Sequence, residues 1–95
     1  MNVDTLDRRS VEAQDRESVT AFQASDQSSF DGLVLRYKNK VFNLCFRLMG
    51  DYQEADDCAQ ETFFKVFQSL KNFRFEASFS TWLYKIAVNT CKNRL

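Results

Sequence analysis

The sequence predicts an all-α fold: a compact three-helix bundle, made of a helical hairpin and a third helix, with a flexible N-terminal arm. The 95-residue chain has no proline and only two glycines, so long windows contain no residue that would break a helix. Apolar residues recur at spacings of three and four, which places them on one side of a helix. Ten phenylalanines supply enough apolar surface for the modest core of one domain.

Residues 1–28 are predicted to form the flexible arm, and residues 29–95 the folded domain. The arm contains six acidic and three basic residues, few large apolar side chains and no sustained periodicity. Segments of this composition bury too little apolar surface to offset the loss of conformational entropy on folding. We therefore expect residues 1–28 to be disordered or only weakly helical.

The first predicted helix begins near Ser28 or Ser29 and ends at Gly50. Ser28 with Asp31 three residues later resembles a capping box, and glycine takes the left-handed conformation that follows many helix ends. The apolar residues between these ends form a seam that requires a helical partner: Phe30, Val34, Tyr37, Val41, Leu44 and Leu48.

A second helix is predicted to follow almost immediately, because Asp51 with Glu54 has the same capping-box pattern. So short a connection turns this helix back against the first, which gives a helical hairpin. Its predicted buried face contains Ala55, Ala59, Thr62, Val66 and Leu70. Phe64 lies on the opposite side among acids and amides, so it is a candidate hot spot for protein contact. The alternative is an exposed aromatic side chain without a function.

Residues Lys71–Ala77 break the helical period and are predicted to form a loop. Phe73 and Phe75 alternate with polar residues there, a composition suited to trapping an unstacked nucleotide. The alternative is that both phenylalanines close the end of the bundle.

The third predicted helix, Ser78–Arg94, carries two stripes of side chains. The core stripe contains Phe79, Leu83, Ile86 and Thr90. The second stripe combines an aromatic ring, two cations and an amide, which can stack on a base, bind phosphates and bond a base edge: Trp82, Lys85, Asn89 and Lys92. The alternative is that Trp82 is a half-buried anchor with a solvated rim.

Charge is unevenly distributed, although the net charge is zero. Residues 51–61 contain five acids and no base, whereas residues 62–95 contain six bases and one acid. Such a division suits one surface that meets a basic partner and another that meets a polyanion. It also complements the helix dipoles without any partner.

The composition disfavours several classes of protein. The chain has three cysteines and no histidine, so the sequence predicts no disulfide framework, no metal site and no cofactor. We expect Cys45 and Cys58 to be small buried hydrophobes. The sequence shows no paired nucleophile and base and no glycine-rich phosphate loop, which argues against an enzyme. It has no apolar window long enough for a membrane span and no N-terminal secretion signal, so we expect a cytoplasmic protein.

Two segments carry a family resemblance. DDCAQETFFKVF at 56–67 and FSTWLYKIAVN at 79–89 resemble conserved region 2 of bacterial sigma factors of the sigma-70 family, in its extracytoplasmic function group. The resemblance covers about Phe30–Leu95 and includes two long motifs in the expected order and separation, which is far more specific than a short pattern.

The resemblance implies a role in transcription initiation. The second helix would dock on the clamp helices of the RNA polymerase β′ subunit through Asp56, Asp57, Gln60, Glu61 and Phe64. The loop and third helix would recognise and melt the promoter −10 element, with a base flipped out of the non-template strand cupped by the loop. The implied DNA-binding residues are Asn72, Phe73, Arg74, Phe75, Ser78, Phe79, Ser80, Thr81, Trp82, Lys85, Asn89 and Lys92. An anti-sigma factor is a further implied partner.

The chain departs from the family pattern in one respect, since no helix-turn-helix domain follows before Leu95. It therefore resembles an isolated promoter-melting domain of a longer protein, expected to bind the −10 element and the clamp weakly because linked modules gain from effective concentration. The competing hypothesis is a helical protein-protein adaptor without DNA binding. That hypothesis explains Phe64 and the acidic face but leaves the Trp82 stripe unexplained.

Overall fold

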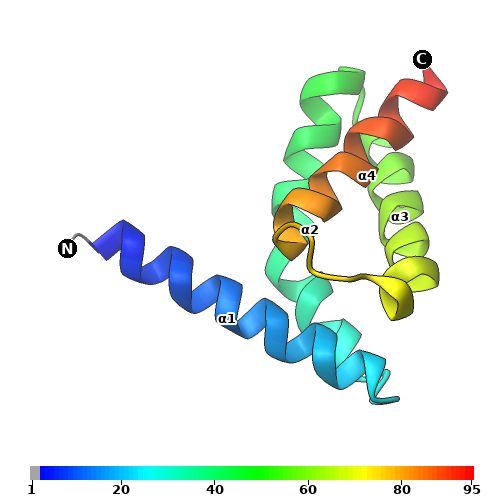
Figure 1. Cartoon of the computed structure of the whole chain (residues 1–95). Helices are drawn as coiled ribbons and strands as arrows, with labels where there is room; N and C mark the ends of the chain where they lie inside the picture. The colour runs from blue at the N-terminus through cyan, green and yellow to red at the C-terminus, as the bar shows by residue number, and fades with distance from the viewer. Residues whose placement is uncertain (1–2) are drawn as a thin grey trace.

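The structure, a computed structural model, describes residues 3–95, with side chains from Ser10 onward. The described residues confirm the all-α class. They form four α-helices and a short 3-10 helix: α1 (Val3–Gln23), α2 (Ser29–Met49), α3 (Tyr52–Ser69), η1 (Leu70–Asn72) and α4 (Phe79–Arg94). Helices α2, α3 and α4 pack against one another, while α1 contacts α2, η1 and α4 (Figure 1). No helix in the described part of the chain is both long and apolar enough to cross a membrane.

Short connections and local caps position the helices. Gly50 ends α2 in the left-handed conformation with φ 73°, as predicted, and its N–H donates to the carbonyl of Phe46. The backbone N–H of Glu54 donates to the Asp51 side chain at 2.9 Å, so Asp51 caps α3. Ser78 caps α4 in the same way, by accepting from the N–H of Thr81 at 3.2 Å.

The predicted capping box at Ser28 is wrong. Ser28 makes no cap bond, because its hydroxyl donates to Asp26 at 2.5 Å. The next residue, Ser29, places its hydroxyl 2.7 Å from the carbonyl of Asp26 and 3.0 Å from that of Ser18. The turn into α2 is therefore fixed by a contact with α1, which local sequence patterns do not reveal.

The core lies between α2, α3 and α4, and α3 buries the predicted face. The α2 seam differs from the prediction, because Leu33 is buried whereas Leu48 is 42% exposed. In α4, Ala87 takes the central buried position and Ile86 is only partly buried. Helix α2 meets three other helices, so its buried surface is wider than the single seam of a two-helix pair.

The three cysteines lie together at the centre of the bundle. Each is fully buried, and each comes from a different helix, Cys45 from α2, Cys58 from α3 and Cys91 from α4. Burial raises the pKa of all three thiols, that of Cys58 to about 11, so they stay protonated at neutral pH. They act as small apolar core side chains, as predicted for two of them.

Most of the predicted flexible arm is a helix in the structure. Residues 3–23 form helix α1, and residues 1–2 of the predicted arm lie outside the described residues. Val19 and Phe22 are buried in the core, and the Phe22 ring packs on those of Phe30 and Phe67 at 6.0 and 5.4 Å. The N-terminal end of α1 leads away from the bundle (Figure 1). Too few apolar residues mark the packed half of α1 for a periodicity argument to detect it.

A buried charge also anchors α1. Asp15 is 2% exposed, and its carboxylate accepts from Arg36 of α2 at 2.5 Å and from the Tyr37 hydroxyl. Burial, together with the nearby Asp15 carboxylate, raises the pKa of Tyr37 far above its usual value, so the hydroxyl remains a donor. Asp15 is thus satisfied by groups on another helix, a pairing that composition alone does not show.

Candidate nucleic-acid and protein-binding surfaces

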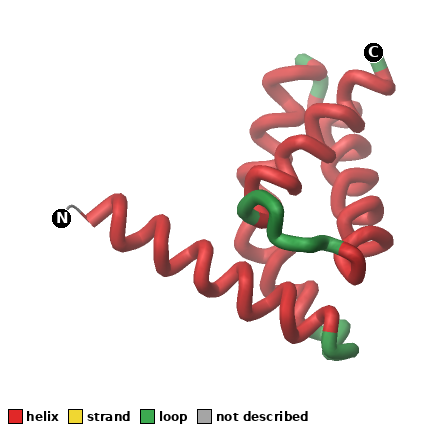
Figure 2. The backbone as a smooth tube through the Cα atoms, viewed as in Figure 1, coloured by secondary structure: helices red, strands yellow, loops and turns green. Residues whose placement is uncertain are grey.

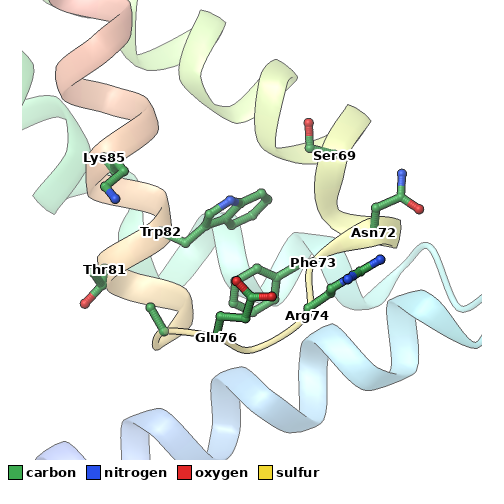
Figure 3. A pocket seen from close by; sticks show the side chains of 9 residues that line it. Ser69, Asn72, Phe73, Arg74, Glu76, Thr81, Trp82 and Lys85 are labelled. Atoms are coloured by element: carbon green, nitrogen blue, oxygen red, sulfur yellow. The ribbon is translucent and has the colours of Figure 1, made fainter.

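The loop between η1 and α4 borders a cavity. Figure 2 shows this segment linking the end of α3 to the start of α4 without regular structure. The cavity has a volume of about 550 Å³, and its walls come from α3, η1, the loop and α4. It is lined by Ser69, Asn72, Phe73, Arg74, Glu76, Ala77, Thr81, Trp82 and Lys85 (Figure 3).

The wall of the cavity is aromatic. Figure 3 shows Trp82 of α4 and Phe73 of the loop close together, with ring centroids 4.7 Å apart and tilted by 36°. Phe75 packs edge-on against Phe73 at 4.8 Å, and Phe79 supports Trp82 at 6.0 Å. Trp82 is therefore half-buried, as the anchor alternative predicted, and it also forms a wall of the cavity.

The rim of the cavity is polar and exposed. Asn72 and Arg74 stand on the loop side, Thr81 and Lys85 stand on α4, and Glu76 lies between them (Figure 3). These five side chains supply an amide, a guanidinium, a hydroxyl, an ammonium and a carboxylate. Within residues 10–95, the three charged ones form no ion pair with one another or with other residues. The rim therefore presents free donors and acceptors around an aromatic wall.

Six of the predicted DNA-contact residues do not line this cavity, and four of these six lie behind its walls. Phe79 is 3% exposed and belongs to the core, where it packs against Tyr37 and beneath Trp82. Ser78 caps α4, and Ser80 is only partly exposed beside it. Phe75 faces α1 instead. These four residues therefore support the loop and the start of α4, whose other residues line the cavity.

The remaining predicted residues continue away from the cavity. Asn89 and Lys92 are exposed and follow Trp82 and Lys85 along one face of α4, as the periodicity predicted. Three lining residues were not among the predicted DNA-contact residues: Glu76, Ala77 and Ser69. Glu76 and Ala77 belong to the predicted loop, whereas no sequence signal marks Ser69, which lies at the end of α3.

A second surface lies on α3, where Phe64 is 62% exposed, as the helical wheel predicted. Asp56, Gln60 and Phe64 lie four residues apart in turn and form one strip. Gln60 donates to the Asp56 carboxylate at 2.9 Å, so the polar part of the strip is partly ordered before any partner binds.

The other two acids of the predicted contact set, Asp57 and Glu61, have partners within the domain. Arg94 at the end of α4 lies 3.6 Å from Asp57, 3.8 Å from Glu61 and 3.2 Å from Glu54. Lys65 adds a contact to Glu61 at 3.8 Å. The structure thus divides the acidic face into a strip that ends in Phe64 and a strip that α4 partly neutralises.

An aromatic groove borders the α3 strip on its α2 side. Phe42 of α2 packs against Tyr52 of α3 with ring centroids 5.1 Å apart, and Tyr52 is 68% exposed. The groove has a volume of about 410 Å³ and is also lined by Lys38, Asp56 and Phe63. Sequence periodicity missed Tyr52, because it lies in the first turn of α3 outside the buried face.

Together these features define a small helical binding domain with one candidate nucleic-acid surface and one candidate protein surface. The family model for sigma-70 region 2 matches residues 33–95, which is most of the chain. The chain therefore belongs to the sigma-70 region 2 family, in agreement with the resemblance carried by residues 56–67 and 79–89.

Individual relatives agree with this assignment. The chain is 48% identical over 85 residues to the RNA polymerase sigma-H factor of Pseudomonas aeruginosa, covering 90% of this chain and 44% of that protein. It is 36% identical over 80 residues to the extracytoplasmic function sigma factor SigW of Bacillus subtilis, covering 84% and 43%. The chain thus spans less than half the length of the curated relatives it matches.

A solved structure has the same fold. An engineered region 2 of sigmaE, determined by NMR in complex with GTAAAA, matches with a TM-score of 0.78 and 42% identity. The match covers 84% of this chain and 83% of that one.

Proposed function

We propose that this domain recognises and melts the promoter −10 element and binds the β′ clamp helices of core RNA polymerase during transcription initiation. The observation that carries the proposal is the cavity formed by the loop and α4. Its volume of about 550 Å³ lies within the range of roughly 300–1,000 Å³ that is typical of ligand pockets. The role is one of binding rather than catalysis and requires no cofactor.

The chemistry of the cavity suits one unstacked base of the non-template strand. The aromatic wall of Phe73 and Trp82 offers a stacking surface, and the polar rim offers partners for a base edge. Lys85, Asn89 and Lys92 extend from the cavity along α4, where cations and an amide track a phosphate backbone. The related sigmaE region 2 in complex with GTAAAA supports this assignment.

The predicted DNA-contact residues divide into those proposed to touch DNA and those proposed to support the cavity. Direct contact falls to the exposed or lining residues Asn72, Phe73, Arg74, Thr81, Trp82, Lys85, Asn89 and Lys92. Four other residues support the loop and the first turn of α4 without lining the cavity: Phe75, Ser78, Phe79 and Ser80.

The α3 strip is the proposed polymerase surface. Phe64 is its exposed aromatic centre, with Asp56 and Gln60 on the same strip and Asp57 and Glu61 beside it. Exposed aromatics surrounded by polar groups are frequent hot spots of protein interfaces. An adaptor without DNA binding would also use this strip, but it would leave the cavity and the basic stripe of α4 without a role.

Three further elements belong to the proposal. A promoter-binding role places the protein in the cytoplasm. The family resemblance adds an anti-sigma factor as a partner. The functional unit includes the packed half of α1 with residues 29–95, because Val19 and Phe22 belong to the same core.

The test is binding of a fluorescent GTAAAA strand and all its single-base variants at two salt concentrations. We expect affinity that falls with salt, because phosphate contacts release counterions, together with a base preference concentrated at one position. Asn72→Ala and Arg74→Ala should change that preference while leaving the salt dependence nearly intact. Absence of binding at both salt concentrations would favour the adaptor.

A further inference from the structure

The loop that forms the cavity is tied to α1 by a side-chain amide. Gln23 Nε2 lies 3.1 Å from the carbonyl oxygen of Leu70 and 2.8 Å from that of Phe73. An amide nitrogen carries two protons, so one donor group satisfies two carbonyls that flank η1. These carbonyls are 47 and 50 residues from Gln23 in sequence. One side chain therefore contacts both the start of η1 and the start of the loop.

A second contact from α1 holds the middle of the loop. Phe75 has φ 58°, a left-handed conformation that non-glycine residues adopt only when their surroundings enforce it. Its ring lies between Phe73, at 4.8 Å, and the guanidinium of Arg16, which is 4.3 Å from the ring centroid. Figure 3 shows α1 running along the loop. Arg16 thus covers the residue whose backbone turns the chain back toward α4.

Phe73 connects these contacts to the cavity. Its carbonyl accepts from Gln23, while its ring packs on Phe75 and on Trp82. A shift of Phe73 would therefore move the aromatic wall of the cavity. Helix α1 is itself fixed by the buried Asp15, so the loop is held against a rigid element. Both contacting residues of α1 lie outside the region that the family model matches, 33–95.

We propose that Gln23 and Arg16 are positioning residues for the base-binding cavity, so that α1 controls how well the domain discriminates the base held there. This inference rests on the proposed function, since it concerns the same cavity. It assigns to α1 a role in specificity without contact between Gln23 and DNA. Gln23 acts through the carbonyls of η1 and the loop, and Arg16 acts through the ring of Phe75.

The decisive variant is Gln23→Met, which removes both donors while keeping the length of the side chain. Gln14→Met is the matched control, because Gln14 lies on an exposed part of α1. Affinity is measured for GTAAAA and for strands in which each nucleotide in turn lacks its base. In the wild-type domain, the strand that loses the most affinity identifies the position held in the cavity. We expect that loss to be about tenfold, the scale of one stacked base.

In Gln23→Met, removing the base held in the cavity should reduce the affinity by less than about threefold, because the displaced aromatic wall no longer holds that base. The affinity for the strand that lacks this base should equal that of the wild type. A general loss of folded protein would instead weaken binding to every strand equally. A 2-aminopurine at the identified position gives an independent readout: its fluorescence on binding should differ between wild type and Gln23→Met but not between wild type and Gln14→Met.

Arg16 needs a control for charge. Arg16→Lys keeps the cation but loses the planar guanidinium, whereas Arg16→Gln removes the charge and replaces the guanidinium with a smaller neutral amide. If Arg16 acts through Phe75, both variants should reduce the discrimination between the strands with and without the base, and Arg16→Lys should keep the salt dependence. A shallower salt dependence for Arg16→Gln with unchanged discrimination would show a phosphate contact and overturn the role assigned to Arg16.

The outcomes separate the two proposals. If the wild-type domain shows no loss at any position, the proposed function itself fails. If the wild type shows the loss and Gln23→Met shows the same loss, α1 does not position the cavity. An equal loss of affinity of Gln23→Met for all strands, with a lower melting temperature, would give Gln23 a purely structural role and would also overturn the inference.

Discussion

The α3 strip and the loop cavity differ in the number of elements that build them. Asp56, Gln60 and Phe64 lie on one face of one helix, and their arrangement follows from the geometry of that helix. The cavity combines residues from α3, η1, the loop and α4, and α1 supports it from behind. A surface on one helix persists while that helix stays docked, whereas a composite cavity can be lost while the bundle remains folded.

The two regions also differ in how far away a change can act. The α3 strip is altered mainly by substitutions within it or in the pairs made by Arg94. The segment that forms the cavity is contacted by a residue 47 and 50 positions away in sequence, so we expect the cavity to respond to residues that touch no ligand. The following predictions use this difference, from the largest expected effect to the smallest.

Val41→Asp should abolish both surfaces together, because it places a carboxylate without a partner at a fully buried position of α2. Circular dichroism should show loss of cooperative melting. Leu44→Asp is the comparison, since Leu44 is only partly buried beside Lys40 and Arg47 and should cost less stability. Equal melting of wild type and Val41→Asp would contradict the assigned core.

Asp15→Ala should remove the cavity while preserving the α3 strip. It leaves Arg36 and the Tyr37 hydroxyl without their partner and should cost about 3 kcal/mol of stability, the lower end for a broken buried pair because Arg36 reaches water. At low temperature, β′ binding should persist while DNA base discrimination falls. Glu17→Ala, an exposed acid of the same helix, should change neither property. Equal loss of both binding activities at temperatures where the domain is folded would remove the distinction drawn between the surfaces.

Phe64→Ala should affect the α3 strip alone. It should weaken binding to the isolated β′ clamp helices by about 1–3 kcal/mol and leave the melting temperature nearly unchanged, because Phe64 is mostly exposed. Phe67→Ala is the matched control: its ring packs edge-on against Phe22 and Phe30, so it should lower stability, by less than the roughly 3–5 kcal/mol of a fully buried phenylalanine. A large drop in melting temperature for Phe64→Ala would show that its ring is structural.

Lys85→Ala and Lys92→Ala should give the smallest effect, confined to the outer part of the DNA surface. Each should weaken binding to all single strands about equally and reduce the salt slope by at most about 0.7, the contribution of one phosphate contact. Lys38→Ala, in the groove between α2 and α3, should leave the slope unchanged. A changed base preference in either α4 lysine variant would assign these side chains to base recognition.

The sequence by itself determined what depends on local geometry. The helix ends at Gly50 and Asp51, the buried face of α3 and the exposed strip that ends in Phe64 all follow from helical periodicity and capping chemistry. The exposed stripe of α4 follows for the same reason, because neighbours three and four residues apart share a helix face whatever surrounds it.

Only the tertiary structure decided the contacts between residues distant in sequence. Asp15 of α1 pairs with Arg36 and Tyr37 of α2, Arg94 divides the acidic face of α3, and Gln23 of α1 donates to the carbonyls of Leu70 and Phe73. Such contacts form when separate helices dock, and their energies come from burial and hydrogen bonds that appear only then. A loop that could hold a base beside an aromatic, basic helix was therefore predictable, whereas the contacts from α1 to that loop were not.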